Sequence, residues 1–349
     1  MVRYQTTDLL YVRIKRSIID GIVSGALKPG DRLPPTVQMA EKYDVCHRTI
    51  QRAMGALVKE GFVVRRPYHG SFVASPDHRM SSPVEEQSVY VFLEVLEEGF
   101  TSAFYVRDML AGIRESAETL GCQVKLGVYS ALDTIPRDHS VAGLLLICPS
   151  REEAMAVKRL GIPAIQLDTG HPRVRLGLVG TNHADGVMQG VRHLVRLGHH
   201  LILYVHSDLS NPDNFSGRER FVGFQQAAKR YNLQVEGYTV EYTALAKRLA
   251  GLKFTAVLTD GYETTVATLN TVRDHGISMP HGVSLVGYDD IELADHLATP
   301  ITVVRQRLRE VGSTSLKLLL DGSVNWRNAR VLVRPELIIR SSTMQAPDR

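Results

Sequence analysis

The chain has 349 residues, of which 44% are hydrophobic and 22% charged, which is typical of a globular protein with two or three domains. The longest apolar run, "VAGLLLIC" at 141–148, is far shorter than the roughly 20 residues that span a bilayer, and the polar first residues exclude a signal-peptide core. Three widely spaced cysteines argue against a disulfide framework or a zinc site and indicate a reducing cytoplasm.

The net charge of +4 is unevenly distributed. Residues 1–75 carry 12 Lys and Arg against 6 Asp and Glu, whereas the rest of the chain carries 29 against 31. A basic segment attached to a nearly neutral body is the charge pattern expected of a small nucleic-acid-binding module.

The first 75 residues predict three helices and a β-hairpin. An apolar stripe (Leu10, Ile14, Ile18, Ile22) marks the first helix, and "GALKPGDRLP" breaks it. Thr36 is expected to cap a short second helix, "VQMAEKY", and a third follows in "VCHRTIQRAMGALVKEGF". The run "FVVRRPYHGSFV" predicts a hairpin with Gly70 at its tip. This order is a winged helix-turn-helix, whose third helix can enter the DNA major groove.

The DNA contacts expected from this arrangement are the polar residues around the start of the third helix and on the wing. They are Thr36, His47, Arg48, Thr49, Gln51, Arg52, Arg65, Arg66, His69 and Gly70. The helix residues offer donors to base edges and phosphates, and the wing arginines are expected to serve phosphates. An ordinary solvated helix face is the alternative interpretation of the third helix.

The segment from "GALKPGDRLPP" to "YHGSFV" resembles the DNA-binding domain of the GntR family of bacterial regulators, and the match covers residues 5–75. The chain departs from the family pattern where contacts are made. It has Pro35 and Val37 near the start of the second helix, where Ser and Arg are common, Cys46-His47 where Ser-Arg is common, and Gln51 in place of a frequent Arg. The resemblance therefore implies the fold rather than the operator sequence.

A linker is expected at 76–87, within the Ser- and Pro-rich stretch "SPDHRMSSPVEEQ". Beyond it, strand-like and helix-like runs alternate, which predicts βαβ units, parallel sheets and an α/β fold with two lobes. The segments "GTNHADGVMQGVRHLVRLGHH", "RERFVGFQQA" and "GVSLVGYDDIELADHLATPITVVRQRLREVG" resemble the effector domain of the LacI/GalR family, which has the periplasmic sugar-binding-protein fold. The whole chain looks like the arabinose-type repressors, which join a GntR DNA-binding domain to such an effector domain.

This resemblance implies an effector-binding and dimerisation domain at 88–345. Lobe 1 is expected at about 88–168 and 291–322, and lobe 2 at about 169–290 and 323–343. A ligand site is expected beyond the carboxyl ends of the strands, between the lobes.

Asp289 ends the strand "VSLVGY" and is the first expected effector contact, because a carboxylate accepts hydrogen bonds from sugar hydroxyls. The family resemblance implies the same role for Asp289 and for Arg220 in "RFVGF". The alternatives are a structural role at the strand end for Asp289 and a surface position on an amphipathic helix for Arg220. Asp260 and Asp168 also follow strands, and for both a structural role is an equal alternative. A metal or acid–base site in "GYDDIELADH" is conceivable, although no second ligand cluster accompanies it.

Phe104 and Tyr105 follow the loop after the first strand of the body. Aromatic rings at this place can stack on the apolar face of a sugar, and core packing is the alternative.

These features predict a bacterial transcriptional regulator, most simply a repressor of carbohydrate genes. It is expected to act as a cytoplasmic homodimer that binds a palindromic operator and responds to a sugar. A sugar phosphate, a nucleobase or no effector at all are the alternatives. No nucleophile elbow, phosphate loop or dinucleotide fingerprint occurs, so neither an enzyme nor a cofactor is expected.

Overall fold

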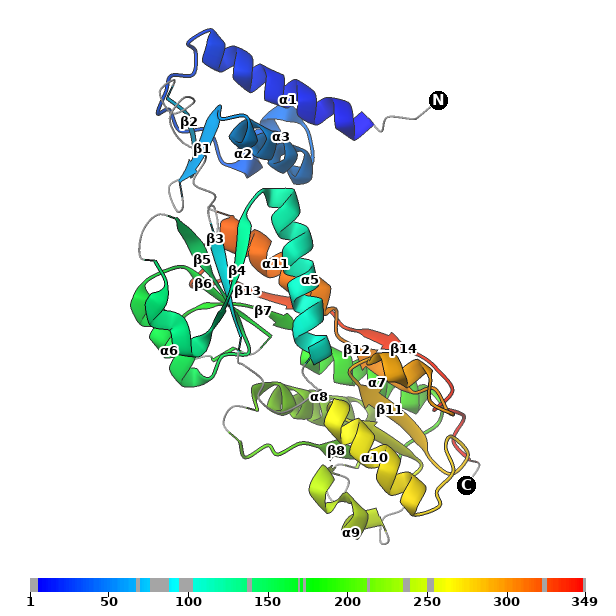
Figure 1. Ribbon diagram of the computed structural model, residues 1–349. Helices are drawn as coiled ribbons and strands as arrows, with labels where there is room; N and C mark the ends of the chain where they lie inside the picture. Colours follow the sequence, from blue (N-terminus) through cyan, green and yellow to red (C-terminus); the bar gives the residue numbers. More distant parts are fainter. Residues whose placement is uncertain are drawn as a thin grey trace.

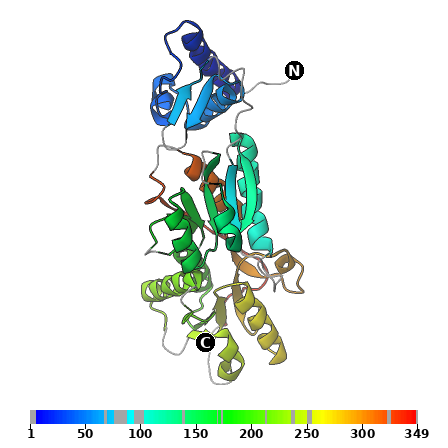
Figure 2. The ribbon, with the colours of Figure 1, turned by 60° about the vertical axis from the view of Figure 1, so that its left-hand side comes forward.

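The computed structural model describes residues 6–66, 70–75, 88–93, 103–136, 140–168, 170–171, 174–211, 214–234, 239–249, 254–321 and 325–347. An N-terminal helical domain, a first α/β lobe and a second α/β lobe follow one another along the molecule (Figures 1 and 2). The expected linker at 76–87 lies outside the described residues.

The N-terminal domain is the predicted winged helix-turn-helix. Its elements are α1 (Thr6–Val23), α2 (Thr36–Tyr43), α3 (His47–Lys59), β1 (Val63–Arg66) and β2 (Gly70–Val73), with the two strands antiparallel. Ile14 and Ile18 of the predicted stripe pack with Ile50, Met54 and Leu57 of α3 to form its core. The prediction that Thr36 caps α2 is wrong, because α2 begins at Thr36 itself and no side chain caps it.

Lobe 1 contains a sheet of six parallel strands in the order β13-β7-β6-β5-β3-β4. The strands are β3 (Ser88–Leu93), β4 (Gln123–Val128), β5 (Val141–Ile147), β6 (Ala164–Leu167), β7 (Gly177–Thr181) and β13 (Arg330–Val333). Helices α5 (Ala103–Leu120) and α11 (Leu308–Leu320) pack together over one core, and α6 (Arg151–Leu160) covers another; a 3₁₀ turn spans Tyr129–Thr134.

Two glycines let α5 and α11 approach backbone to backbone. A Cβ added at Gly112 would lie 1.9 Å from the carbonyl oxygen of Arg309, and one at Gly312 would lie 2.1 Å from that of Met109. These distances leave no room for a side chain, so this contact requires glycine at both positions.

Lobe 2 contains a second six-stranded sheet in the order β14-β12-β11-β10-β8-β9, parallel except for β14. The strands are β8 (Ile202–His206), β9 (Thr239–Glu241), β10 (Ala256–Thr259), β11 (Ser284–Tyr288), β12 (Thr302–Arg305) and β14 (Glu336–Ile338). The helices are α7 (His183–Arg196), α8 (Phe215–Tyr231), α9 (Leu245–Leu249) and α10 (Tyr262–Asp274), with 3₁₀ turns at Tyr242–Ala244 and Glu292–Asp295. Tyr204 stacks on Phe224 in its core.

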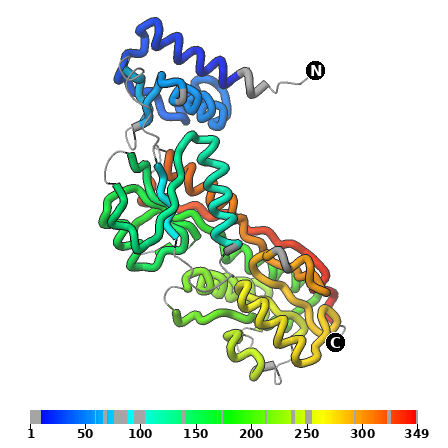
Figure 3. Tube along the Cα trace, viewed as in Figure 1, coloured from blue at the N-terminus to red at the C-terminus, as the bar shows by residue number. Residues whose placement is uncertain are grey.

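Within the described residues there are three crossings between the lobes, each one or two residues long. Figure 3 follows the course of the chain from one lobe to the other. The crossings follow β7, β12 and β13. The expected lobe limits therefore differ from the structure: β7 and β13 complete the sheet of lobe 1, and β12 lies in lobe 2. The sheet membership of a short apolar strand depends on the strands it pairs with, and the pattern of the strand itself carries no such information.

Candidate functional site

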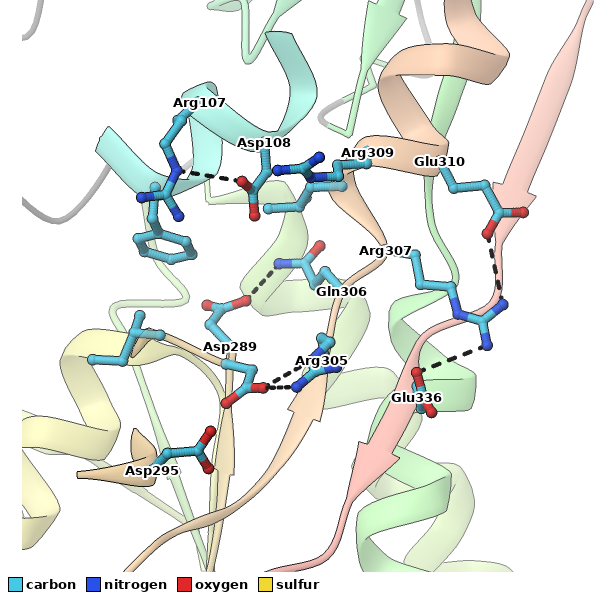
Figure 4. Close-up of a pocket in the computed structure, with 14 residues that line it drawn as sticks. Arg107, Asp108, Asp289, Asp295, Arg305, Gln306, Arg307, Arg309, Glu310 and Glu336 are labelled. Atoms are coloured by element: carbon cyan, nitrogen blue, oxygen red, sulfur yellow. Dashed lines mark hydrogen bonds and ion pairs between the residues drawn. The ribbon is translucent and has the colours of Figure 1, made fainter. Parts of the chain in front are cut away.

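A cavity of about 710 Å³ opens between the lobes (Figure 4). Helices α5 and α11 of lobe 1 contribute Phe104, Arg107, Asp108, Leu308, Arg309 and Glu310. Lobe 2 contributes Asp289, Asp290, Ile291, Asp295, Arg305 and Glu336, and the crossing after β12 contributes Gln306 and Arg307. The volume lies within the range of small-molecule sites.

Acidic groups dominate this lining. Six carboxylates and four guanidinium groups face the cavity, and each of the four arginines already pairs with a carboxylate. The pairs are Arg107–Asp108, Arg305–Asp290, Arg307–Glu310 and Arg309–Glu115. This charge balance favours a neutral polar ligand over an anionic one.

Asp289 is held at the carboxyl end of β11 by groups from the crossings. Its amide donates to the carbonyl of Val304 at 2.9 Å, and its Oδ1 accepts from Nε2 of Gln306 at 2.6 Å. Oε1 of Gln306 in turn accepts from the hydroxyl of Thr181 at 2.6 Å. Asp289 is thus tied to the ends of two crossing strands, β7 and β12, so its position depends on how the lobes are joined.

Asp290 lies in a buried arginine clamp next to Asp289. Arg340 reaches both oxygens of Asp290, at 2.9 and 3.0 Å, and Nε of Arg305 donates to it at 2.7 Å. Arg340 also pairs with Asp295. The Asp290 and Arg340 side chains are only 5% and 9% exposed. A paired and buried carboxylate of this kind fixes the loop that carries Asp289.

Three residues at strand ends have left-handed backbone conformations. They are Cys148 after β5 (φ 46°), Asp168 after β6 (φ 62°) and Asp289 after β11 (φ 70°). Non-glycine residues in this region cost on the order of 1–3 kcal/mol and cluster at functional sites. Both lobes therefore bend their backbones sharply where the sheets face each other.

A buried polar cluster lies between the lobes, outside the cavity lining. Asp168 of lobe 1 accepts a hydrogen bond from the amide of Thr181 at 3.1 Å, and its Oδ1 lies 3.5 Å from Nε2 of His183 at the start of α7. Burial raises the pKa of Asp168, but the charge of His183, hydrogen bonds from His183 and Tyr105, and the charge of Arg220 together hold that pKa well below its usual value.

Arg220 completes this cluster from α8. Its guanidinium group lies 4.1 Å from the ring centre of Tyr288, and it donates to Nδ1 of His183 at 3.2 Å and to the carbonyl of Asp260. The other ring nitrogen of His183, Nε2, faces Asp168. Burial lowers the pKa of Arg220. The negative charges around it raise the pKa by more, so that the net pKa lies above the usual value; they come from Tyr288, Asp289, Asp260 and Asp168.

Asp260 has a structural role within lobe 2. One of its oxygens accepts from both the amide and the hydroxyl of Ser207, at 2.9 and 2.8 Å, and the other accepts from Thr264 at 2.9 Å. The residue is 1% exposed. These bonds join the end of β8 to the start of α10, so the expected effector contact is not available from this carboxylate.

The two predicted aromatic residues point to different places. Phe104 lines the cavity and meets Tyr262 of lobe 2 with ring centres 6.3 Å apart. The side chain of Tyr105 is hydrogen-bonded to Asp168, and its hydroxyl lies 3.8 Å from Sγ of Cys148. Burial raises the pKa of Tyr105 well above its usual value. Phe104 therefore presents a ring to the cavity, whereas Tyr105 belongs to the buried cluster.

The expected DNA surface has exposed and buried members. Arg48 is exposed on the first turn of α3, and Gln51 is partly exposed. Nε2 of His47 lies 2.9 Å from the hydroxyl of Thr36, which links the first turns of α2 and α3. Thr49 is only 3% exposed and bonds to Cys46 at 3.2 Å, so its expected contact with DNA is contradicted.

Two of the expected DNA-binding arginines are engaged elsewhere in the chain. The guanidinium group of Arg52 lies 4.2 Å from the ring centre of Tyr11 on α1. Arg65 is partly buried near Asp321 at the end of α11; burial lowers its pKa, and the charge of Asp321 opposes this change. Gly70 begins β2 at φ 102° instead of standing at the hairpin tip. His69 and the side chain of Arg66 lie outside the described residues.

Sequence reasoning missed His183 and Gln306. His183 is the second residue after β7 and the first of α7. Asn182, between them, caps α7 because its side chain accepts from the amide of Asp185 at 3.1 Å. Gln306 follows β12 directly. The available signal was a polar residue just after an apolar strand, the same signal that identified Asp289.

The described residues hold no group of three or more His, Cys, Asp or Glu side chains suited to a metal ion. None of their helices combines the length and apolar character needed to cross a bilayer.

Two family profiles match separate parts of the chain. Residues 10–73 match the bacterial regulatory proteins of the gntR family, and residues 191–343 match the periplasmic binding protein-like domain. An arabinose metabolism transcriptional repressor of Geobacillus stearothermophilus is 23% identical over 96% of this chain and 98% of its own length. The lactose operon repressor of Escherichia coli K12 is 26% identical over 69% of this chain and 71% of its own length.

Solved structures show the same α/β fold. A regulatory protein of the LacI family from Chloroflexus aggregans aligns with a TM-score of 0.66 and 20% identity, over 74% of this chain and 99% of its own. A lac repressor dimer bound to operator and an anti-inducer aligns with a TM-score of 0.62 and 23% identity, over 74% of this chain and 94% of its own. The predicted fold class, an α/β body behind a helix-turn-helix domain, is confirmed.

Proposed function

We propose that this chain, which joins a GntR-type helix-turn-helix domain to a LacI-like periplasmic-binding-protein domain, is a transcriptional repressor controlled by a neutral sugar. The similar proteins named above are repressors, and one of them matches nearly the full length of both chains. As a homodimer, the protein would place two winged domains on a palindromic operator.

In this proposal the first turn of α3 carries the DNA contact. Arg48 is exposed there and offers several donors in a fixed fork, which suits the acceptor pair of a guanine edge or a phosphate. Gln51 lies one turn further along and is partly exposed. Thr36 and His47 serve mainly to hold α2 against α3, because their side chains bond to each other.

Asp289 is the observation that carries the effector part of the proposal. It faces a cavity between the lobes, has a strained backbone, and is held by Gln306 at a crossing. Its second oxygen would accept hydrogen bonds from sugar hydroxyls, while the ring of Phe104 would cover an apolar sugar face.

The charge of the cavity favours a neutral sugar over a sugar phosphate. Its carboxylates outnumber its guanidinium groups, and the arginines of the lining are already paired. A phosphate would share these guanidinium groups with the carboxylates that already pair with them, and it would add negative charge to a lining in which carboxylates are in excess.

Effector binding would alter operator affinity only through a difference in effector affinity between two lobe arrangements. The hydrogen bonds from Asp289 through Gln306 to Thr181 cross the hinge, so a ligand on Asp289 acts directly on the residues that join the lobes. A coupling of about 1–3 kcal/mol is typical of such regulators.

The experiment is thermal unfolding of the full chain with neutral pentoses and hexoses and with their phosphates. A ligand at one hundred times its Kd adds about 2.7 kcal/mol and raises Tm by several degrees. The shift should disappear in Asp289→Asn and persist in Asp274→Asn, whose carboxylate is 64% exposed on α10. The active sugar is then added to a DNA-binding assay, where it should change operator affinity.

Three outcomes would count against the proposal. A shift from sugar phosphates alone would refute the neutral-sugar assignment, and a shift that survives in Asp289→Asn would refute the site. Strong sugar binding with unchanged operator affinity would refute the regulatory role.

A further inference from the structure

An exposed valine stands on the first turn of α2. Val37 is the second residue of this helix and is 50% exposed. Met39, two residues further, is 2% exposed and packs in the domain core. Residues two apart on an α-helix point to nearly opposite sides, so Val37 points away from the core that Met39 helps to form.

This valine lies next to the start of the proposed recognition helix. The hydroxyl of Thr36, the neighbouring residue, lies 2.9 Å from Nε2 of His47, the first residue of α3. The first turns of α2 and α3 are therefore adjacent, and each exposes a side chain, Val37 on α2 and Arg48 on α3. DNA that meets the first turn of α3 would pass next to the first turn of α2, which carries Val37.

We propose that Val37 contacts the 5-methyl group of a thymine in the operator. Its side chain holds only methyl groups, and the thymine methyl is the one apolar feature that base pairs present in the major groove. Arg48 and Val37 would thus read different features of neighbouring base pairs, a polar edge and a methyl group. The inference rests on the proposed function, since it requires α3 to enter the groove.

The test begins with a duplex that the full-length wild-type chain selects from random DNA. Each thymine of this duplex is then replaced singly by deoxyuridine, which removes only the 5-methyl group. At one position in each half-site the replacement should weaken wild-type binding about fourfold, which is the effect of removing one buried methyl group.

The matching variant is Val37→Ala, which shortens an exposed side chain on a helix and keeps good helix propensity. It should bind the thymine duplex more weakly than wild type and show no further loss with deoxyuridine at that position. Val12→Ala is the control, because Val12 is 43% exposed on α1. It should respond to deoxyuridine as wild type does.

The outcomes separate this inference from the proposed function. A selected duplex whose response to deoxyuridine is the same in wild type and Val37→Ala overturns the inference alone. Failure to enrich any duplex overturns the proposed function, and the inference with it.

Discussion

Replacing Arg340 with methionine would break the buried ion pair that holds the loop next to Asp289. Two terminal nitrogens of Arg340 lie 2.9 and 3.0 Å from the two oxygens of Asp290, and both side chains are less than 10% exposed. Removing one partner of a buried pair costs about 3–5 kcal/mol, because the remaining charge stays buried. Arg305 remains on Asp290 and compensates in part, so we expect a loss of about 3 kcal/mol.

Thermal unfolding followed by circular dichroism measures this effect. A loss of about 3 kcal/mol lowers Tm by about 6–12 °C in a domain of this size. The double variant Arg340→Met/Asp290→Asn removes both charges and should recover more than half of the loss. Arg273→Met is the control, because Arg273 pairs with Asp274 on an exposed helix surface, where both side chains are more than 60% exposed.

The result that would refute this reasoning is a Tm of Arg340→Met no lower than that of Arg273→Met. Equal stability of the single and double variants would also contradict it, since the unpaired charge of Asp290 is the expected source of the loss.

Three further predictions address DNA binding, helix packing and acid stability. Arg48→Ala should weaken operator binding about tenfold or more in an anisotropy assay, while Thr49→Val, at a buried position, should keep the wild-type affinity. Gly112→Ala should lower the free energy of unfolding by about 3 kcal/mol in urea, since its Cβ would overlap the carbonyl of Arg309; an unchanged midpoint would contradict the backbone contact. Asp168→Asn should be less stable than wild type at pH 7. Because the native pKa of Asp168 is lowered, this difference should shrink as pH falls below about 4, where the unfolded chain takes up a proton at Asp168 while the native carboxylate is still ionised; a constant difference would contradict the assignment.

The sequence predicted the architecture because its local patterns all indicated the same arrangement of helices and strands. The apolar stripe of α1, the Gly- and Pro-rich break after it and the alternation of strands and helices each led to the observed element. The limits of the lobes were missed, because β7, β12 and β13 are short apolar strands whose sheet depends on distant partners.

The site was predicted in part. Asp289 and Phe104 reach the cavity, because the end of a strand and the start of a helix can be located from local patterns. The Asp289–Gln306 hydrogen bond joins residues that follow two different strands, β11 and β12, so no local pattern shows it. Thr49 was misassigned although a signal existed: it lies four residues before Ala53, which is buried, and so shares the inward face of α3.

The three short crossings between the lobes limit how the lobes can move. Two bodies joined at one edge by tethers of one or two residues can rotate about that edge but can hardly slide or twist apart. The relative motion of the two lobes is thus close to a single rotation about the edge where the crossings lie. A ligand that bridged the cavity would contact both lobes and so narrow the range of this rotation.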